Sequence, residues 1–122
     1  MKVLILEQEK TIRQSLKNLM ETYRSLEVFT AQSGNEGRSL FKAIPFDVIL
    51  CGHQLPDSNG LELLKEFLRN NPKLISILMT SHSDDKLKQD AEEAGIQAYL
   101  EKPFDLRQLE EAMGVVHSGS SS

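Results

Sequence analysis

The sequence of 122 residues has one cysteine and no excess of positive charge. With Cys51 alone, an internal disulfide and a cysteine-rich zinc site are both excluded. The net charge of −4 argues against broad binding to nucleic acid or to anionic membranes, which requires a clustered basic face. No apolar run approaches the roughly 18–20 residues that span a bilayer, and the apolar stretch 2–6 is too short for a signal-peptide core. These absences predict a cytoplasmic protein.

Signatures of catalysis and cofactor binding are also missing. No glycine-rich phosphate loop follows the first apolar stretch, where Glu7, Gln8 and Glu9 form an acidic turn instead. The histidines lack the HxxxH or HExxH spacing of metal sites, and no nucleophile–base pair is evident. We therefore expect neither enzyme activity nor a cofactor, and no metal site.

What is present is the composition of an ordinary globular protein, with 39% hydrophobic and 26% charged residues. The length suits one domain with one closed core. We expect this domain to cover residues 1–117. The tail 118–122 has the sequence Ser-Gly-Ser-Ser-Ser, which is typical of a flexible linker or of a remnant of an expression vector.

Apolar patterning predicts five strands that alternate with five helices. The expected strands are 2–6, 26–31, 46–51, 74–79 and 97–100, and the expected helices are 11–23, 33–43, 61–68, 84–94 and 106–116. Connections this short favour a doubly wound open sheet over a barrel, which would need roughly 250 residues. The predicted fold is therefore an α/β, flavodoxin-like (βα)5 parallel sheet with strand order 2-1-3-4-5.

In such a sheet the loops after strands 1, 3, 4 and 5 gather at one end, near the point where the strand order reverses. We expect seven residues to meet there: Glu7, Gln8, Gly52, His53, Thr80, Ser81 and Lys102. Gly52 ends the central apolar strand, so a residue without a side chain stands where chemistry would be expected.

Four local motifs make the whole chain resemble the receiver domain of bacterial two-component response regulators. They are Val3-Leu-Ile-Leu-Glu-Gln-Glu9, Asp47-Val-Ile-Leu-Cys-Gly-His-Gln-Leu-Pro-Asp-Ser-Asn-Gly-Leu-Glu-Leu-Leu64, Ile77-Leu-Met-Thr-Ser81 and Ala98-Tyr-Leu-Glu-Lys-Pro-Phe104. Each motif alone is weak, but the four in this order and spacing are specific.

The resemblance implies phosphoryl transfer from a histidine kinase to an aspartate four residues before the proline of the strand-3 loop. Counting back from Pro56 gives Gly52, which has no carboxylate. The family's acid pair, which helps to hold Mg²⁺, falls on Glu7 and Gln8, and only one of these is a carboxylate. The resemblance thus implies an atypical pseudo-receiver without magnesium binding.

Several matching positions survive in this degenerate site. Thr80 matches the family's switch hydroxyl, Lys102 its phosphate-contacting lysine and Tyr99 its aromatic switch position, while Pro103 matches a cis-proline. Without an aspartate, Lys102 is expected either to pair with Glu7 or to point to solvent. Thr80 is expected to be a satisfied loop hydroxyl.

Other residue groups have competing interpretations. His53, His82 and Glu7 could converge on a zinc ion, although His82 is expected to be exposed. Cys51 is most simply a small core residue. The acidic run from Asp84 to Glu93 is expected to be a solvated helix face or part of a partner surface.

The function that follows is phosphorylation-independent docking to another signalling protein or to a fused effector domain, with a possible homodimer through helix 4, strand 5 and helix 5. The expected contact residues are Lys88, Glu92, Tyr99, Glu101, Arg107 and Glu110. The alternative is a small-molecule or nucleotide sensor that uses the vacated pocket. A third possibility, phosphorylation of Asp57, ranks last because Asp57 lies beyond Pro56.

Overall fold

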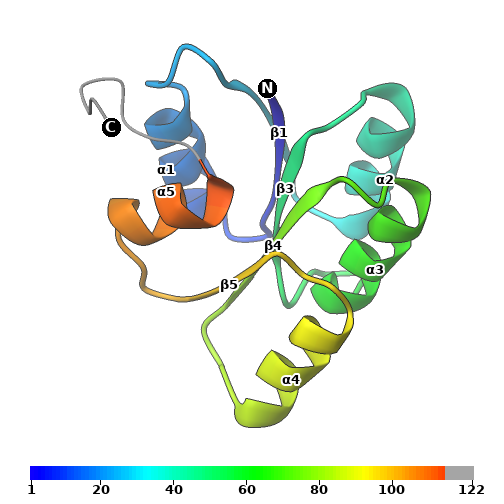
Figure 1. Cartoon of the computed structure of the whole chain (residues 1–122). Coiled ribbons are helices and arrows are strands. Elements are labelled where there is room, and N and C mark those ends of the chain that lie inside the picture. Colours follow the sequence, from blue (N-terminus) through cyan, green and yellow to red (C-terminus); the bar gives the residue numbers. More distant parts are fainter. Residues whose placement is uncertain (115–122) are drawn as a thin grey trace.

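The computed structural model of the chain describes residues 1–114, in which five parallel strands alternate with five helices (Figure 1). The elements are β1 (Lys2–Leu6), α1 (Lys10–Met20), β2 (Glu27–Ala31), α2 (Gly34–Ala43), β3 (Val48–Gly52), α3 (Gly60–Asn70), β4 (Ile75–Thr80), α4 (Asp85–Glu93), β5 (Ala98–Glu101) and α5 (Leu106–Met113). The strand order is β2-β1-β3-β4-β5, which confirms the predicted topology. No helix in residues 1–114 has both the length and the apolarity to cross a membrane.

Helices cover both faces of the sheet. In Figure 1, α1 and α5 lie together on one side, while α2, α3 and α4 lie on the other. Two apolar clusters fill the spaces between helices and sheet, one against each face. The side chains of β1 alternate between them, since Val3 and Ile5 face α1 and α5 whereas Leu4 and Leu6 face the opposite helices. Continuous apolar runs in the sequence therefore mark strands that are buried on both faces.

Side-chain caps account for where most helices begin. Ser33 accepts a hydrogen bond from Glu36 N at 3.2 Å and caps α2. Asp84 accepts one from Leu87 N at 2.7 Å and caps α4. Asp105 forms a complete capping box with Gln108 at the start of α5. Each cap satisfies backbone N–H groups that have no partner within the helix.

The boundaries differ from the predicted ones by up to three residues. α1 ends at Met20 because Thr22 and Tyr23 bond to carbonyls three residues back, and Tyr23 is buried in the turn that follows. Gly52 and Thr80 are the last residues of their strands and not the first of their loops. Val116, predicted as part of α5, and the tail 118–122 lie outside the described residues.

The amino terminus of α3 packs directly on the end of β3. Gly60 N donates to the carbonyl oxygen of His53 at 2.7 Å. A Cβ at position 60 would overlap the carbonyl oxygen of Gly52 and come within 3.1 Å of the His53 Cα. Only glycine allows this approach, because the neighbouring atoms are backbone and cannot rotate away.

We predict that Gly60→Ala lowers the free energy of unfolding by about 2–3 kcal/mol, because the added methyl forces two backbone segments apart. Urea denaturation measures the change. Gly95→Ala is the matched control, since Gly95 has a φ of +82° and open space around its Cβ. The control should lose only the roughly 1 kcal/mol of a left-handed backbone. Equal losses in both variants would contradict the close approach at Gly60.

Candidate functional site

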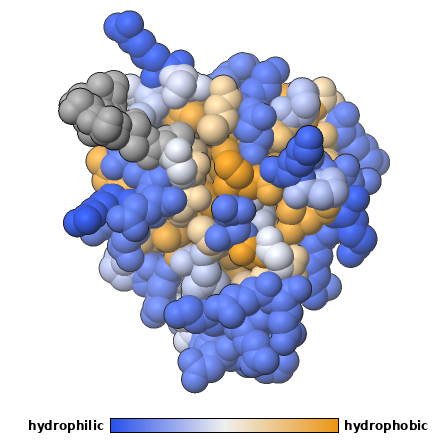
Figure 2. Space-filling view, viewed as in Figure 1, coloured by the Kyte–Doolittle hydropathy of each residue, from blue (hydrophilic) through white to orange (hydrophobic). Residues whose placement is uncertain are grey.

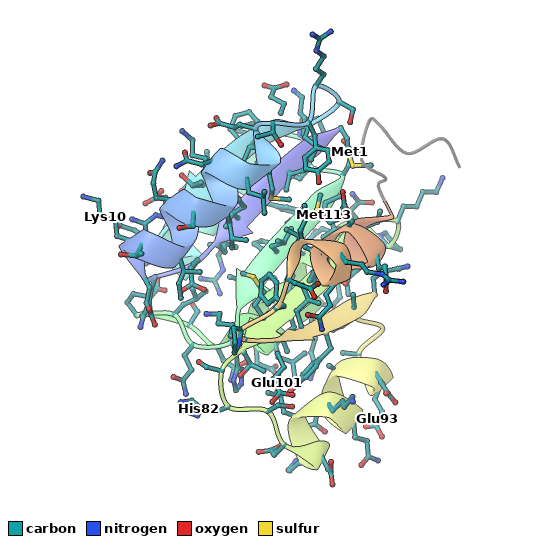
Figure 3. The ribbon with its side chains drawn as sticks, turned by 90° about the vertical axis from the view of Figure 1, so that its left-hand side faces the viewer. Met1, Lys10, His82, Glu93, Glu101 and Met113 are labelled. Carbon is teal, nitrogen blue, oxygen red and sulfur yellow. The ribbon has the colours of Figure 1, made fainter. Side chains whose placement is uncertain are left out.

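A small pocket of about 40 Å³ lies at the carboxyl ends of the strands. All seven residues that the sequence predicted at this end line it. Figure 3 places Glu101 at the end of β5 and His82 on the loop that follows β4, both at this end of the sheet. The remaining lining residues are Glu9, Gln54, Met79 and His82. The convergence expected from the strand order is therefore confirmed.

A buried ion pair lies in this pocket. Lys102 Nζ is 2.8 Å from the Glu7 Oε1 atom, and the side chains are only 17% and 2% exposed. Of the two arrangements expected for Lys102, the structure shows the pair with Glu7. The pair joins the end of β1 to the loop that follows β5. Strands β3 and β4 lie between these two strands in the sheet.

The second carboxylate oxygen of Glu7 is also satisfied. Glu7 Oε2 accepts a hydrogen bond from the backbone N–H of Glu9 at 3.0 Å. The Arg13 guanidinium donates to the carbonyl oxygens of Glu7 at 2.8 Å and Gln8 at 3.2 Å. Arg13 belongs to α1, so the helix that follows the acidic turn also fixes the position of that turn. Arg13 was not among the predicted site residues, because its position six residues after Glu7 does not by itself indicate this contact.

Gly52 lies beside the pair and leaves room for it. A Cβ at position 52 would come within 3.1 Å of Glu7 Oε1 and 3.5 Å of the carbonyl oxygen of Leu6. A Cβ at this position would therefore require the Glu7 carboxylate to shift by a few tenths of an ångström. The absence of a side chain at position 52 leaves space for the Glu7 carboxylate that pairs with Lys102.

These residues do not fit a magnesium ion. Mg²⁺ requires octahedral oxygen ligands, commonly including one or two carboxylates. Glu7 supplies the only carboxylate at the family's metal positions, and an ammonium group and an N–H already occupy its two oxygens. Gln8 has an uncharged, exposed side chain and Gly52 has none. The ammonium group of Lys102 lies beside the Glu7 carboxylate, where a metal ion would have to bind.

Thr80 and Tyr99, the two matched switch positions, both have hydrogen-bond partners. Thr80 is 3% exposed, and its Oγ1 accepts from His82 N at 3.1 Å. This satisfied loop hydroxyl agrees with the prediction. The Tyr99 hydroxyl donates to Ser83 Oγ at 2.7 Å and so ties β5 to the loop before α4. The Lys102–Pro103 peptide bond is cis, as the family pattern implies.

The proposed zinc ligands do not assemble into a metal site. His82 is exposed, and residues 1–114 contain no group of three His, Cys, Asp or Glu side chains that could hold a metal ion. His53 Nδ1 is buried without a hydrogen-bond partner within this range. Cys51 is fully buried, and burial, followed by the nearby Glu7 charge, raises the pKa of its thiol well above the usual range. It is a core residue, as predicted.

Asp57 has a structural role that the sequence did not indicate. Its carboxylate accepts hydrogen bonds from the backbone N–H groups of Gly34 at 2.7 Å and Asn35 at 2.9 Å. These bonds, led by the one from Asn35, lower the pKa of Asp57. Asp57 therefore caps α2 from a distant loop, and its two oxygens are engaged there.

Most residues of the predicted docking face are exposed. Lys88, Glu92, Glu101 and Arg107 are exposed and Tyr99 is half-buried. Glu110 instead accepts a 2.6 Å hydrogen bond from the Tyr23 hydroxyl, so its carboxylate is directed to the turn after α1. Burial and this bond raise the pKa of Tyr23 to about 12.

Comparison with known proteins gives one consistent match. The model of the response regulator receiver domain family matches residues 3–114. The transcriptional regulatory protein CrdR of Helicobacter pylori is 35% identical over 112 residues, covering 89% of this chain and 51% of its own length. The transcriptional regulatory protein LnrK of Bacillus subtilis is 29% identical over 97% of this chain and 54% of its own length. The chain thus spans about half the length of these relatives.

A solved structure supports the same assignment. The crystal structure of a response regulator receiver domain protein from Clostridium thermocellum has a TM-score of 0.84 and 31% identity to this chain. The match covers 93% of this chain and 90% of that one. The likeness therefore extends over most of the chain.

We predict that Lys102→Met lowers the free energy of unfolding by about 3 kcal/mol or more, because it leaves the buried Glu7 carboxylate without its partner. The double variant Glu7→Gln/Lys102→Met should recover most of this loss, since no uncompensated charge remains. Chemical denaturation of the two single variants and the double variant measures the coupling. The exposed Lys88→Met is the control and should change stability by about 0.5 kcal/mol or less. A Lys102→Met effect as small as that of the control would contradict the buried pair.

Proposed function

The chain belongs to the family of response regulator receiver domains, and from that premise we propose that it is a pseudo-receiver that signals without phosphorylation. The observation that carries the proposal is the absence of a carboxylate at Gly52, beside a Glu7–Lys102 pair that fills the charge site. An acyl phosphate needs a carboxylate oxygen as acceptor. Asp57 supplies none here, because both its oxygens cap α2.

The state of such a domain is set by contacts that do not change with phosphorylation. Lys102 is held by Glu7, Thr80 by the loop that follows it, and Tyr99 by Ser83. In this proposal the three groups that would respond to a phosphoryl group instead hold one surface permanently in place. Neither magnesium nor another cofactor takes part.

The surface that transmits the signal is formed by α4, β5 and α5. It carries the exposed residues Lys88, Glu92, Glu101 and Arg107, and Tyr99 connects it to the pocket. The relatives of about twice this length are named transcriptional regulatory proteins. This supports, as partner, either an effector domain fused to the receiver or a separate signalling protein.

The alternative of a nucleotide or metabolite sensor in the vacated pocket loses support. Ligand sites usually enclose about 300–1,000 Å³, whereas this pocket measures about 40 Å³. Glu7 and Glu9 line it and would repel a phosphate group. Lys102, which could attract one, is already paired with Glu7.

We predict that beryllofluoride with magnesium leaves the backbone amide NMR spectrum unchanged around Gly52, Thr80 and Lys102. Beryllofluoride mimics a phosphoryl group bonded to an aspartate, and Gly52 offers no oxygen for it. Incubation with acetyl phosphate and magnesium should likewise leave the protein mass unchanged. Saturable beryllofluoride shifts or a stable phosphoryl adduct would refute phosphorylation independence. A typical receiver domain treated in parallel is the positive control.

We predict that Gly52→Asp restores at most weak phosphorylation by acetyl phosphate. The new carboxylate would stand beside the Glu7 carboxylate and compete with it for Lys102, and the uncharged Gln8 would still weaken magnesium binding. The double variant Gly52→Asp/Gln8→Asp should take up more phosphate than the single variant, because it restores the acid pair. Phosphoryl content is measured by mass spectrometry. Robust uptake by the single variant would show that Gln8 is not limiting.

A further inference from the structure

The negative charge of the molecule is concentrated in one segment. Residues 84–111, which form α4, β5 and α5, contain nine carboxylates and four cations, a net charge of −5. Because the whole chain has a net charge of −4, the remainder has a net charge of +1. The nine acidic residues are Asp84, Asp85, Asp90, Glu92, Glu93, Glu101, Asp105, Glu110 and Glu111.

The cations of this segment are almost all engaged within the molecule. Lys86 pairs with Asp90 at 3.3 Å, Arg107 with Glu111 at 3.2 Å, and Lys102 with the buried Glu7. Lys88 is the one cation of the segment for which the described residues provide no ion pair. Asp85, Glu92 and Glu101 are exposed and likewise lack an ion pair within residues 1–114. The face therefore presents uncompensated negative charge.

Two of the carboxylates lie where a helix disfavours them. Glu92 and Glu93 are in the last turn of α4, which contains no basic residue. The carboxyl end of a helix has a partial negative charge, so acidic side chains there reduce helix stability. A cation bound at this end would relieve both the dipole and the side-chain repulsion. In Figure 3, Glu93 lies at this end of α4 and Glu101 at the end of β5, so the two mark opposite ends of the face.

The centre of the face is less polar than its rim. β5 pairs only with β4, so its outer edge has no strand partner in the described structure. Ile96 and Ala98 are partly exposed beside this edge, and Leu106, at the start of α5, is 38% exposed. Figure 2 shows hydrophobic side chains in the middle of the molecule and hydrophilic ones over α4 at its lower end. An apolar centre with a charged rim is typical of protein interfaces.

We propose that the α4–β5–α5 face binds a protein segment rich in lysine or arginine with apolar residues between them. This inference rests on the proposed docking function and specifies its partner. The cationic side chains lie against Glu92, Glu93 and Glu101, and the apolar ones lie over the edge of β5. Complementary charge of this kind steers association and selects the partner.

The same charges disfavour the other occupants of this face. A two-fold homodimer brings the same patch of each copy together, so it would place two acidic faces against each other. Nucleic acid is repelled for the same reason. The homodimer expected from the family pattern therefore loses support on this face.

Titration with a synthetic peptide of alternating lysine and valine tests the inference. Its counterpart with glutamate in place of lysine is the control peptide. Amide NMR shifts should saturate in β5 and in the last turn of α4, and the affinity should fall as salt rises, because exposed charges are then screened. The variant Glu92→Gln/Glu93→Gln should bind about 2- to 30-fold more weakly, the range expected for two exposed ion pairs.

The matched control variant is Glu36→Gln/Glu62→Gln, which removes two exposed carboxylates from α2 and α3 and should leave binding unchanged. An equal loss in both variants, the absence of saturable binding, or binding of the glutamate peptide would overturn the inference. A dimer through this face at low salt, detected by sedimentation, would overturn it as well. The beryllofluoride experiment does not involve this face, so its result tests the proposed function independently.

Discussion

The ion pair between Lys102 and Glu7 is the interaction on which the pocket depends. A lysine and a glutamate this well buried are tolerated only as a pair, because either charge alone would lose its hydration without compensation. Strands β3 and β4 separate β1 from β5. The pair therefore requires β1 and β5 to end at the same level of the sheet. It also requires an unoccupied space beside β3, which Gly52 provides. One glycine and one ion pair thus account for the local geometry of this pocket.

The backbone around this site is equally constrained. Gly60 brings the start of α3 against the carbonyl of Gly52, and Asp57, in the loop between them, caps α2. The loop after β3 is therefore held by the backbone contacts of Gly60 and by the Asp57 cap, and neither contact uses the Glu7 or Lys102 side chain. In the proposed pseudo-receiver the scaffold therefore does not depend on a phosphoacceptor, because packing and backbone hydrogen bonds specify the loop.

The central strands β1 and β3 could be predicted because their apolar runs are uninterrupted. The strand order follows from short right-handed crossovers. The strand ends were less certain, since Gly52 and Thr80 have neither the apolar side chain nor the turn chemistry that would assign them. Side-chain partners across the fold were largely out of reach. The sequence predicted two alternative arrangements for Lys102. It did not indicate that Asp57 caps another helix, or that Glu110 accepts a hydrogen bond from Tyr23. Each of these depends on a contact between residues far apart in the chain.

In the proposed pseudo-receiver, the absence of a phosphoacceptor also changes what the proposed docking face must accomplish. In a switch, the affinity of a surface for its partner must differ between two states. A domain held in one state has no such requirement, so affinity and selectivity come from the fixed surface itself. Acidic residues at the end of α4 reduce the stability of the free helix, and a basic partner would offset that loss when it binds. Charge that is unfavourable in the isolated domain is therefore consistent with a surface adapted to a partner of opposite charge.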